Sequence, residues 1–122
     1  MSNAINWFEI PARNFDEAKS FYGKILNTEL HVENIMGIQM AMLPYSEDGV
    51  GGAICTGEGY APTTDGTLPY LNGGNDLQDI LSRVESAGGQ IIMPKTKISD
   101  EVGHVAVFHD TEGNRIGLHS PN

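Results

Sequence analysis

The sequence is poor in cysteine and in basic residues. Of its 122 residues only Cys55 is a cysteine, and seven Lys and Arg stand against sixteen Asp and Glu, which gives a net charge of −9. One cysteine excludes an internal disulfide and any multi-cysteine zinc or iron–sulfur cluster. The acidic balance repels polyanions, so we expect no nucleic-acid partner.

Long apolar runs are also missing. No stretch approaches the roughly 18 consecutive apolar residues of a membrane-spanning helix. The first ten residues, MSNAINWFEI, lack the basic start and apolar stretch of a secretory signal. We therefore expect a cytoplasmic protein with no membrane partner. At this length, with 39% hydrophobic residues, the chain suffices for one compact domain with a modest core, which we place over residues 1–122.

Two segments have apolar residues at helical spacing, namely Phe15, Ala18, Phe21, Tyr22 and Ile25, and then Leu77, Ile80, Leu81 and Val84. Before the first, Asn14 is a suitable N-cap, and Glu17 follows three residues later in a capping-box arrangement. After the second, Gly88 and Gly89 provide the left-handed conformation that ends many helices. The spacing therefore predicts two amphipathic helices.

The two halves of the chain match each other. A short strand precedes each helix, INWFEI and then LPYLN, and strand-like runs follow each helix. Trp7 aligns with Tyr70 and Ala41 with Ala106, at a shift of about 62 to 65 residues. The pattern predicts an α+β protein of two βαβββ units, over about residues 1–57 and 66–122, with TGEGYAPTTDGTLP as linker.

Alternation with period two assigns the strand faces. We expect an apolar set to lie beneath the helices: Phe8, Ile10, Val105, Val107, Ile116 and Leu118. The other face of a curved mixed sheet then encloses a ligand cavity. Its predicted members are Trp7, Glu9, Gln39, Ala41, Ala53, Cys55, Tyr70, Asn72, His104, Ala106, Gly117 and His119.

Three features together resemble the vicinal oxygen chelate superfamily, which includes glyoxalase, bleomycin-resistance proteins and extradiol dioxygenases. They are NFDEAKSFYGKIL after the first strand, the duplicated unit, and HDTEGNRIGLHS near the end. The resemblance implies the glyoxalase/bleomycin-resistance fold and a homodimer. It is weakly specific for a reaction, because one fold hosts many activities.

In metal-dependent members of that superfamily, His, Gln or Glu on the first and last strand of each unit bind a divalent ion. Carried onto this sequence, the four positions hold Trp7, Ala53, Tyr70 and Gly117. None is a usual metal ligand. We therefore expect no metal and no cofactor, and we expect Gly117 to leave room in the cavity.

Two residues further along these strands come Glu9, Cys55, Asn72 and His119. They leave open a displaced metal site or an acid–base pair of Glu9 and His119, which we expect to approach each other. No catalytic residue is assigned. The aromatic rings of the two halves either stack on a flat ligand or fill the core. The predicted ligand-binding residues are Trp7, Glu9, Tyr70, Asn72 and His119.

Two functions follow from this set. The first is a metal-free small-molecule-binding protein of the glyoxalase/bleomycin-resistance type. The second is a glyoxalase-like lyase or isomerase that acts on a small carbonyl or thiol-adduct substrate. Metal content and activity on hemithioacetals would separate them.

Overall fold

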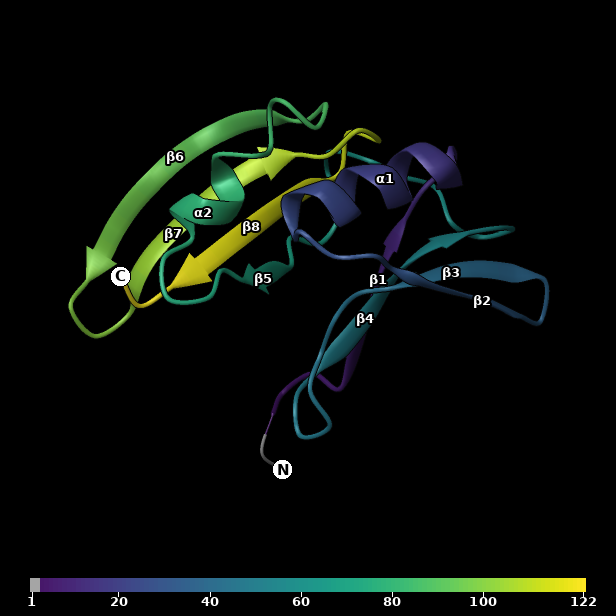
Figure 1. Ribbon diagram of the computed structural model, residues 1–122, viewed down its shortest axis with the longest axis horizontal. Helices are drawn as coiled ribbons and strands as arrows, with labels where there is room; N and C mark the ends of the chain where they lie inside the picture. The colour runs from purple at the N-terminus through teal and green to yellow at the C-terminus, as the bar shows by residue number, and fades with distance from the viewer. Residues whose placement is uncertain (1–2) are drawn as a thin grey trace.

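The computed structural model describes residues 3–122, and Figure 1 shows their arrangement. Neither of the helices in this range is long and apolar enough to cross a membrane. In chain order the elements are β1 (Trp7–Pro11), α1 (Phe15–Ile25), β2 (His31–Ile35), β3 (Ile38–Met42), β4 (Gly51–Thr56), β5 (Tyr70–Asn72), α2 (Gln78–Leu81), β6 (Gln90–Ser99), β7 (Gly103–His109) and β8 (Arg115–Ser120).

The strands form two four-stranded mixed sheets of identical topology. One has the order β1-β4-β3-β2 and the other the order β5-β8-β7-β6. In each sheet the first strand of the unit pairs parallel with the last, and the remaining pairs are antiparallel. The second half thus repeats the first element by element, which confirms the predicted α+β fold of two βαβββ units. The bounds 1–57 and 66–122 for these units stay a prediction.

Helix α1 begins where the sequence predicts, but its N-terminus is capped from the other half of the chain. The Glu17 amide donates to the side-chain oxygen of Asn14 at 3.2 Å, which confirms the N-cap. The reciprocal bond expected from the Glu17 carboxylate is replaced by Glu112, which accepts from the amides of Arg13 and Asn14 at 2.7 and 2.9 Å. A carboxylate at this end also stabilises the helix, because its negative charge lies at the positive end of the helix dipole.

Helix α2 is shorter than predicted. It ends at Leu81, and turns continue the chain to Gly88, whose φ of +110° is the left-handed conformation expected there. The hydroxyl of Ser82 donates to the Asp79 carbonyl, one turn back. Such local bonds compete with regular helix. The apolar residues Leu77, Leu81 and Val84 are nevertheless buried as their spacing predicts.

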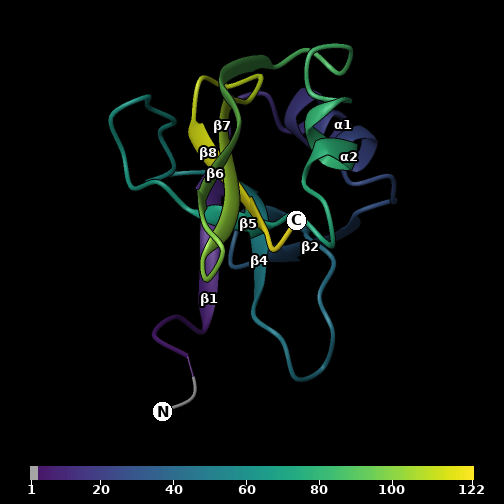
Figure 2. The same cartoon turned by 90° about the vertical axis from the view of Figure 1, so that its left-hand side faces the viewer.

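Both helices lie on the same side of the two sheets. In Figure 2 they stand to the right of the strands, and the linker between β4 and β5 lies to the left. One hydrophobic cluster combines residues of α1 with residues of both sheets, as the packing of Phe21 against Phe108 illustrates, with ring centroids 5.9 Å apart. We call the face of each sheet that points away from the helices its outer face.

A buried polar network holds the turn between β7 and β8 against the first half of the chain. We call it the turn clamp. The Tyr22 hydroxyl donates to Asp110 Oδ2 at 2.7 Å, and Asp110 Oδ1 accepts from the amides of Glu112 and Asn114 at 2.9 Å. The Asn114 side chain in turn donates to the Pro11 carbonyl at 2.8 Å. Burial, and then the charge of Asp110, raise the pKa of Tyr22, so its phenol remains a donor.

The face predicted for β7 is wrong by one residue. Ala106 pairs with Leu118, and both belong to the core, whereas Val105 and Val107 lie on the outer face opposite His119 and Gly117. His104 is likewise on the helix side, opposite Ser120. The centre of this strand is apolar at every position, so alternation cannot separate its faces.

The same shift applies to β3. Gln39 and Ala41 were expected on the outer face, but Ala41 is fully buried opposite Ile54 in the core. Met40 and Met42 occupy the outer face instead, opposite Cys55 and Ala53. The alternation of β3 is also weak, because apolar residues flank Ala41 on both sides.

Candidate functional site

All five predicted ligand-binding residues lie on outer faces, but on two different sheets. They are Trp7 and Glu9 on β1, Tyr70 and Asn72 on β5, and His119 on β8. The parallel registers fix these faces, because directly paired residues of neighbouring strands point to the same side. All five are exposed in the single chain.

In each half, an aromatic ring packs against a glycine of the neighbouring strand. Trp7 pairs with Gly51, and Tyr70 pairs with Gly117. A Cβ atom added to Gly51 would lie 3.0 Å from Trp7 Cζ3, and one added to Gly117 would lie 2.6 Å from Tyr70 Cε2. The expectation that Gly117 leaves open space is therefore wrong, since the Tyr70 ring fills it. The register also shows that Gly51 is the counterpart of Gly117, in place of Ala53.

One step further along, Glu9 pairs with Ala53, and Asn72 pairs with His119. Ala53 thus occupies the place in the first sheet that His119 occupies in the second. Cys55 pairs with Pro11 and lies outside this row. The predicted quartet of Glu9, Cys55, Asn72 and His119 is therefore divided between two sheets.

Glu9 accepts hydrogen bonds from two aromatic side chains. Trp7 Nε1 donates to Oε2 at 3.2 Å, and the Tyr60 hydroxyl donates to Oε1 at 2.5 Å. The bond to Glu9 raises the pKa of Tyr60 to about 12, so the phenol stays protonated. Tyr60 lies in the linker, and sequence reasoning missed it, because no periodicity places a linker residue over a particular strand.

Cys55 lies beside this group but is fully buried. Burial, and then the charge of Glu9, raise the pKa of its thiol to about 12. The thiolate is the nucleophilic form of cysteine, so this thiol is poorly suited to attack a substrate at neutral pH. Its reading as a small buried residue is the better one.

His119 and Glu9 do not meet within the chain. His119 Nε2 donates to the Val102 carbonyl at 2.6 Å, and neither a hydrogen bond nor an ion pair joins it to Glu9 among residues 3–122. Asn72 accepts from the Gly74 amide at 2.9 Å. The predicted approach of Glu9 and His119 is therefore wrong for a single chain, which does not bring these two residues together as an acid–base pair.

The residues at the family's metal positions do not fit a divalent ion. An indole, a phenol and two glycines at positions 51 and 117 offer too few donors for coordination. Within the described range, no three His, Cys, Asp or Glu side chains come together in a metal-binding group.

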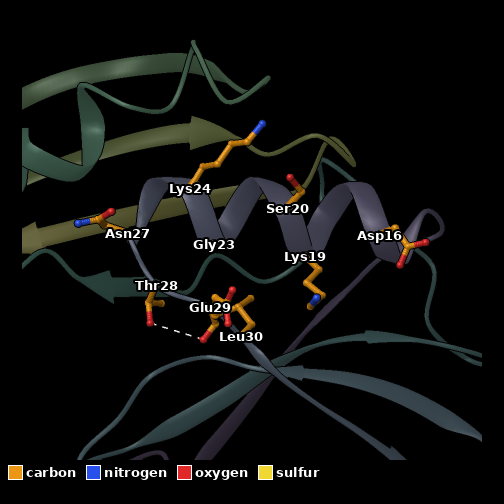
Figure 3. Close-up of a pocket in the computed structure, with 9 residues that line it drawn as sticks. All are labelled: Asp16, Lys19, Ser20, Gly23, Lys24, Asn27, Thr28, Glu29 and Leu30. Atoms are coloured by element: carbon orange, nitrogen blue, oxygen red, sulfur yellow. Dashed lines mark hydrogen bonds between the residues drawn. The ribbon is translucent and has the colours of Figure 1, made fainter.

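Three hollows of the surface lie near these elements. One of about 140 Å³ adjoins Glu9 and the linker, and one of about 400 Å³ lies between the sheets beside Tyr70 and Asn72. The third, of about 740 Å³, follows the flank of α1, where Figure 3 shows Lys19 and Lys24 pointing away from each other. Its charges do not converge, so it offers no defined polar site.

A known protein family and several solved structures share this arrangement of strands. The family model described as Glyoxalase/Bleomycin resistance protein/Dioxygenase superfamily matches residues 4–118. The chain belongs to this superfamily. No curated protein sequence matches it at a significant level. Family membership was predicted from the helix and turn motifs, and it is confirmed.

Solved structures of this superfamily share the fold. TnmS3, an antibiotic binding protein from Streptomyces sp. CB03234, is 23% identical with a TM-score of 0.65, over 100% of this chain and 99% of that one. A glyoxalase/bleomycin resistance protein from the same organism is 21% identical, with a TM-score of 0.66 and coverages of 93% and 97%. A glyoxalase I mutant from Zea mays is 18% identical with a TM-score of 0.67, over 93% of this chain and 44% of that one.

Proposed function

We propose that this chain is a metal-free small-molecule-binding protein of the glyoxalase/bleomycin-resistance type. One observation carries the proposal. In both halves, the positions that hold metal ligands in metal-dependent relatives carry an aromatic ring on a glycine, Trp7 on Gly51 and Tyr70 on Gly117. These positions supply apolar surface for a ligand in place of metal coordination.

The five predicted residues have distinct roles in this proposal. Trp7 and Tyr70 remain 39% and 49% exposed, so their ring faces are available to stack on a flat ligand. Glu9, Asn72 and His119 lie beside them and orient polar groups of the ligand. The antibiotic binding protein named above, which has the same fold, supports a binding role.

We also propose a homodimer. The five predicted residues are exposed in the single chain, and they are divided between the outer faces of the two sheets. A second copy that placed its Tyr70 and His119 opposite Trp7 and Glu9 would enclose a ligand between them. Light scattering on the purified protein distinguishes this dimer from a monomer.

Ligand binding can be followed through Trp7, which is the only tryptophan of the chain. We expect bleomycin, after which part of the superfamily is named, or another flat ligand of an antibiotic panel, to quench its fluorescence saturably. Tyr70→Leu should weaken binding about fivefold to tenfold, as expected for loss of one stacked ring. Saturable quenching that Tyr70→Leu leaves unchanged would contradict a site shared by both faces. Turnover of hemithioacetals would instead favour the lyase alternative.

The purified protein is expected to carry no stoichiometric zinc, nickel, iron or manganese. The physical reason is the lack of donors at positions 7, 51, 70 and 117. Elemental analysis of protein prepared without chelator checks it. About one metal ion per chain, with a fall in thermal stability on its removal, would contradict the metal-free proposal.

A further inference from the structure

Three aromatic side chains and one carboxylate follow one another on the outer face of the β1–β4 sheet. We call them the Trp7 row: Tyr45, Trp7, Glu9 and Tyr60. The rings of Tyr45 and Trp7 are nearly perpendicular, at 84°, with centroids 6.3 Å apart. Both rings lie over Gly51, whose added Cβ would come within 3.0 Å of each. A larger residue at position 51 would displace them.

The two ends of the Trp7 indole have different neighbours. Its six-membered ring is beside Tyr45 over Gly51, whereas its Nε1 atom donates to Glu9 at the other end. Tyr45 is 56% exposed, so this corner is open to solvent. A group seated on the indole face would therefore have a second ring on one side and a carboxylate on the other.

The charge of Glu9 has no cationic partner in residues 3–122. Its hydrogen-bond donors there are neutral, the indole of Trp7 and the phenol of Tyr60, and none of the ion pairs in this range includes it. The net charge of −9 adds a negative potential around the site. Aromatic faces and a carboxylate both attract a cation, and tryptophan is the most favourable aromatic side chain for this interaction.

We propose that the Trp7 row binds an organic ammonium ion, with its alkylated nitrogen on the face of Trp7 between Tyr45 and Glu9. This deepens the proposed function and rests on it, because it names the ligand class for the first outer face. A quaternary ammonium fits better than a primary one, since it makes no hydrogen bonds and loses less hydration on an aromatic surface. Glu9 keeps its hydrogen bonds from Trp7 and Tyr60, and its negative charge attracts the ammonium ion.

The second sheet offers a control within the same molecule. Tyr70 lies on Gly117 as Trp7 lies on Gly51, but its polar neighbours are Asn72 and His119, which carry no negative charge. No second ring packs against Tyr70 in the described part of the chain. The proposal therefore assigns the cation to the first sheet alone.

Choline and its neutral isostere 3,3-dimethylbutan-1-ol test the proposal on the full-length protein. Titrations followed by the methyl proton signals of each compound do not depend on Trp7 fluorescence. We expect choline to bind at least about tenfold more tightly than the alcohol, since only the charge differs. Equal binding of the two compounds, or no binding of choline, would overturn the cation assignment.

Variants then locate the site. We expect Glu9→Gln and Tyr45→Leu each to weaken choline binding about fivefold or more, and Glu85→Gln, which removes an exposed carboxylate from the turns after α2, to leave it unchanged. Unchanged thermal unfolding of each variant excludes loss of fold. A loss in Glu85→Gln equal to that in Glu9→Gln would overturn the proposal. If antibiotics quench Trp7 while choline does not bind, the proposed function stands and only this inference fails.

Discussion

Replacing Asp110 by alanine is expected to lower the free energy of unfolding by about 3 to 5 kcal/mol, because the Tyr22 hydroxyl and two backbone amides lose the acceptor that its carboxylate provides. Asp110 accepts from the Tyr22 hydroxyl, from two amides of its own turn and from the Asn114 side chain. At least two of these donors belong to buried residues, Tyr22 and Asn114. Each buried donor left unpaired costs about 1 to 3 kcal/mol.

Urea unfolding monitored by circular dichroism measures this loss. Asp65→Ala is the matched control, because it removes the same side chain from an exposed position of the linker. Its effect should stay within about 0.5 kcal/mol. Tyr22→Phe should lie between the two, since it removes one bond of the turn clamp and leaves the others. A loss below about 1 kcal/mol in Asp110→Ala would contradict the role of the turn clamp.

Gly117→Ala is expected to cost about 1 to 3 kcal/mol, because the new methyl group displaces the Tyr70 ring that lies on the glycine. The cost should vanish or change sign in a Tyr70→Ala background, where strand propensity favours alanine over glycine by a fraction of a kcal/mol. The four proteins of this double-mutant cycle, unfolded in urea, give the coupling between positions 70 and 117 directly.

The equivalent cycle at Gly51 and Trp7 is the internal comparison. The methyl group introduced by Gly51→Ala would contact two rings, those of Trp7 and Tyr45. Removing Trp7 alone should therefore recover only part of the lost free energy of unfolding. A coupling energy near zero between positions 70 and 117 would show that the Tyr70 ring moves aside freely. The presence of glycine at position 117 would then have to be explained by its backbone conformation instead of by the Tyr70 ring.

Local signals predicted the elements of this fold well. Helix α1 combines apolar spacing, an N-cap and a first turn with acidic residues, and all of them agree. The duplication was visible because equivalent residues keep their order over both halves. The faces of β3 and β7 were mistaken because apolar residues occupy both sides of these strands, and only pairing with Ile54 and Leu118 decides which side is buried.

The candidate site was predicted in part. The face of the five residues followed from alternation on β1, β5 and β8, where polar and apolar residues do alternate. Three contacts had no local signal. They are the bond from Tyr60 to Glu9 across 51 residues, the cap of α1 by Glu112 across 98 residues, and the packing of Tyr70 on Gly117. Each depends on how distant segments meet.

The turn clamp makes the two copies of the repeated unit thermodynamically inseparable. Tyr22 of the first unit is hydrogen-bonded to the turn between β7 and β8 in the second unit. Glu112 of that turn in return caps helix α1 of the first unit. Neither half can lose its structure without exposing buried partners of the other, so partly unfolded states with one intact unit are high in free energy. We therefore expect this chain, although it is duplicated in sequence, to unfold in a single cooperative transition.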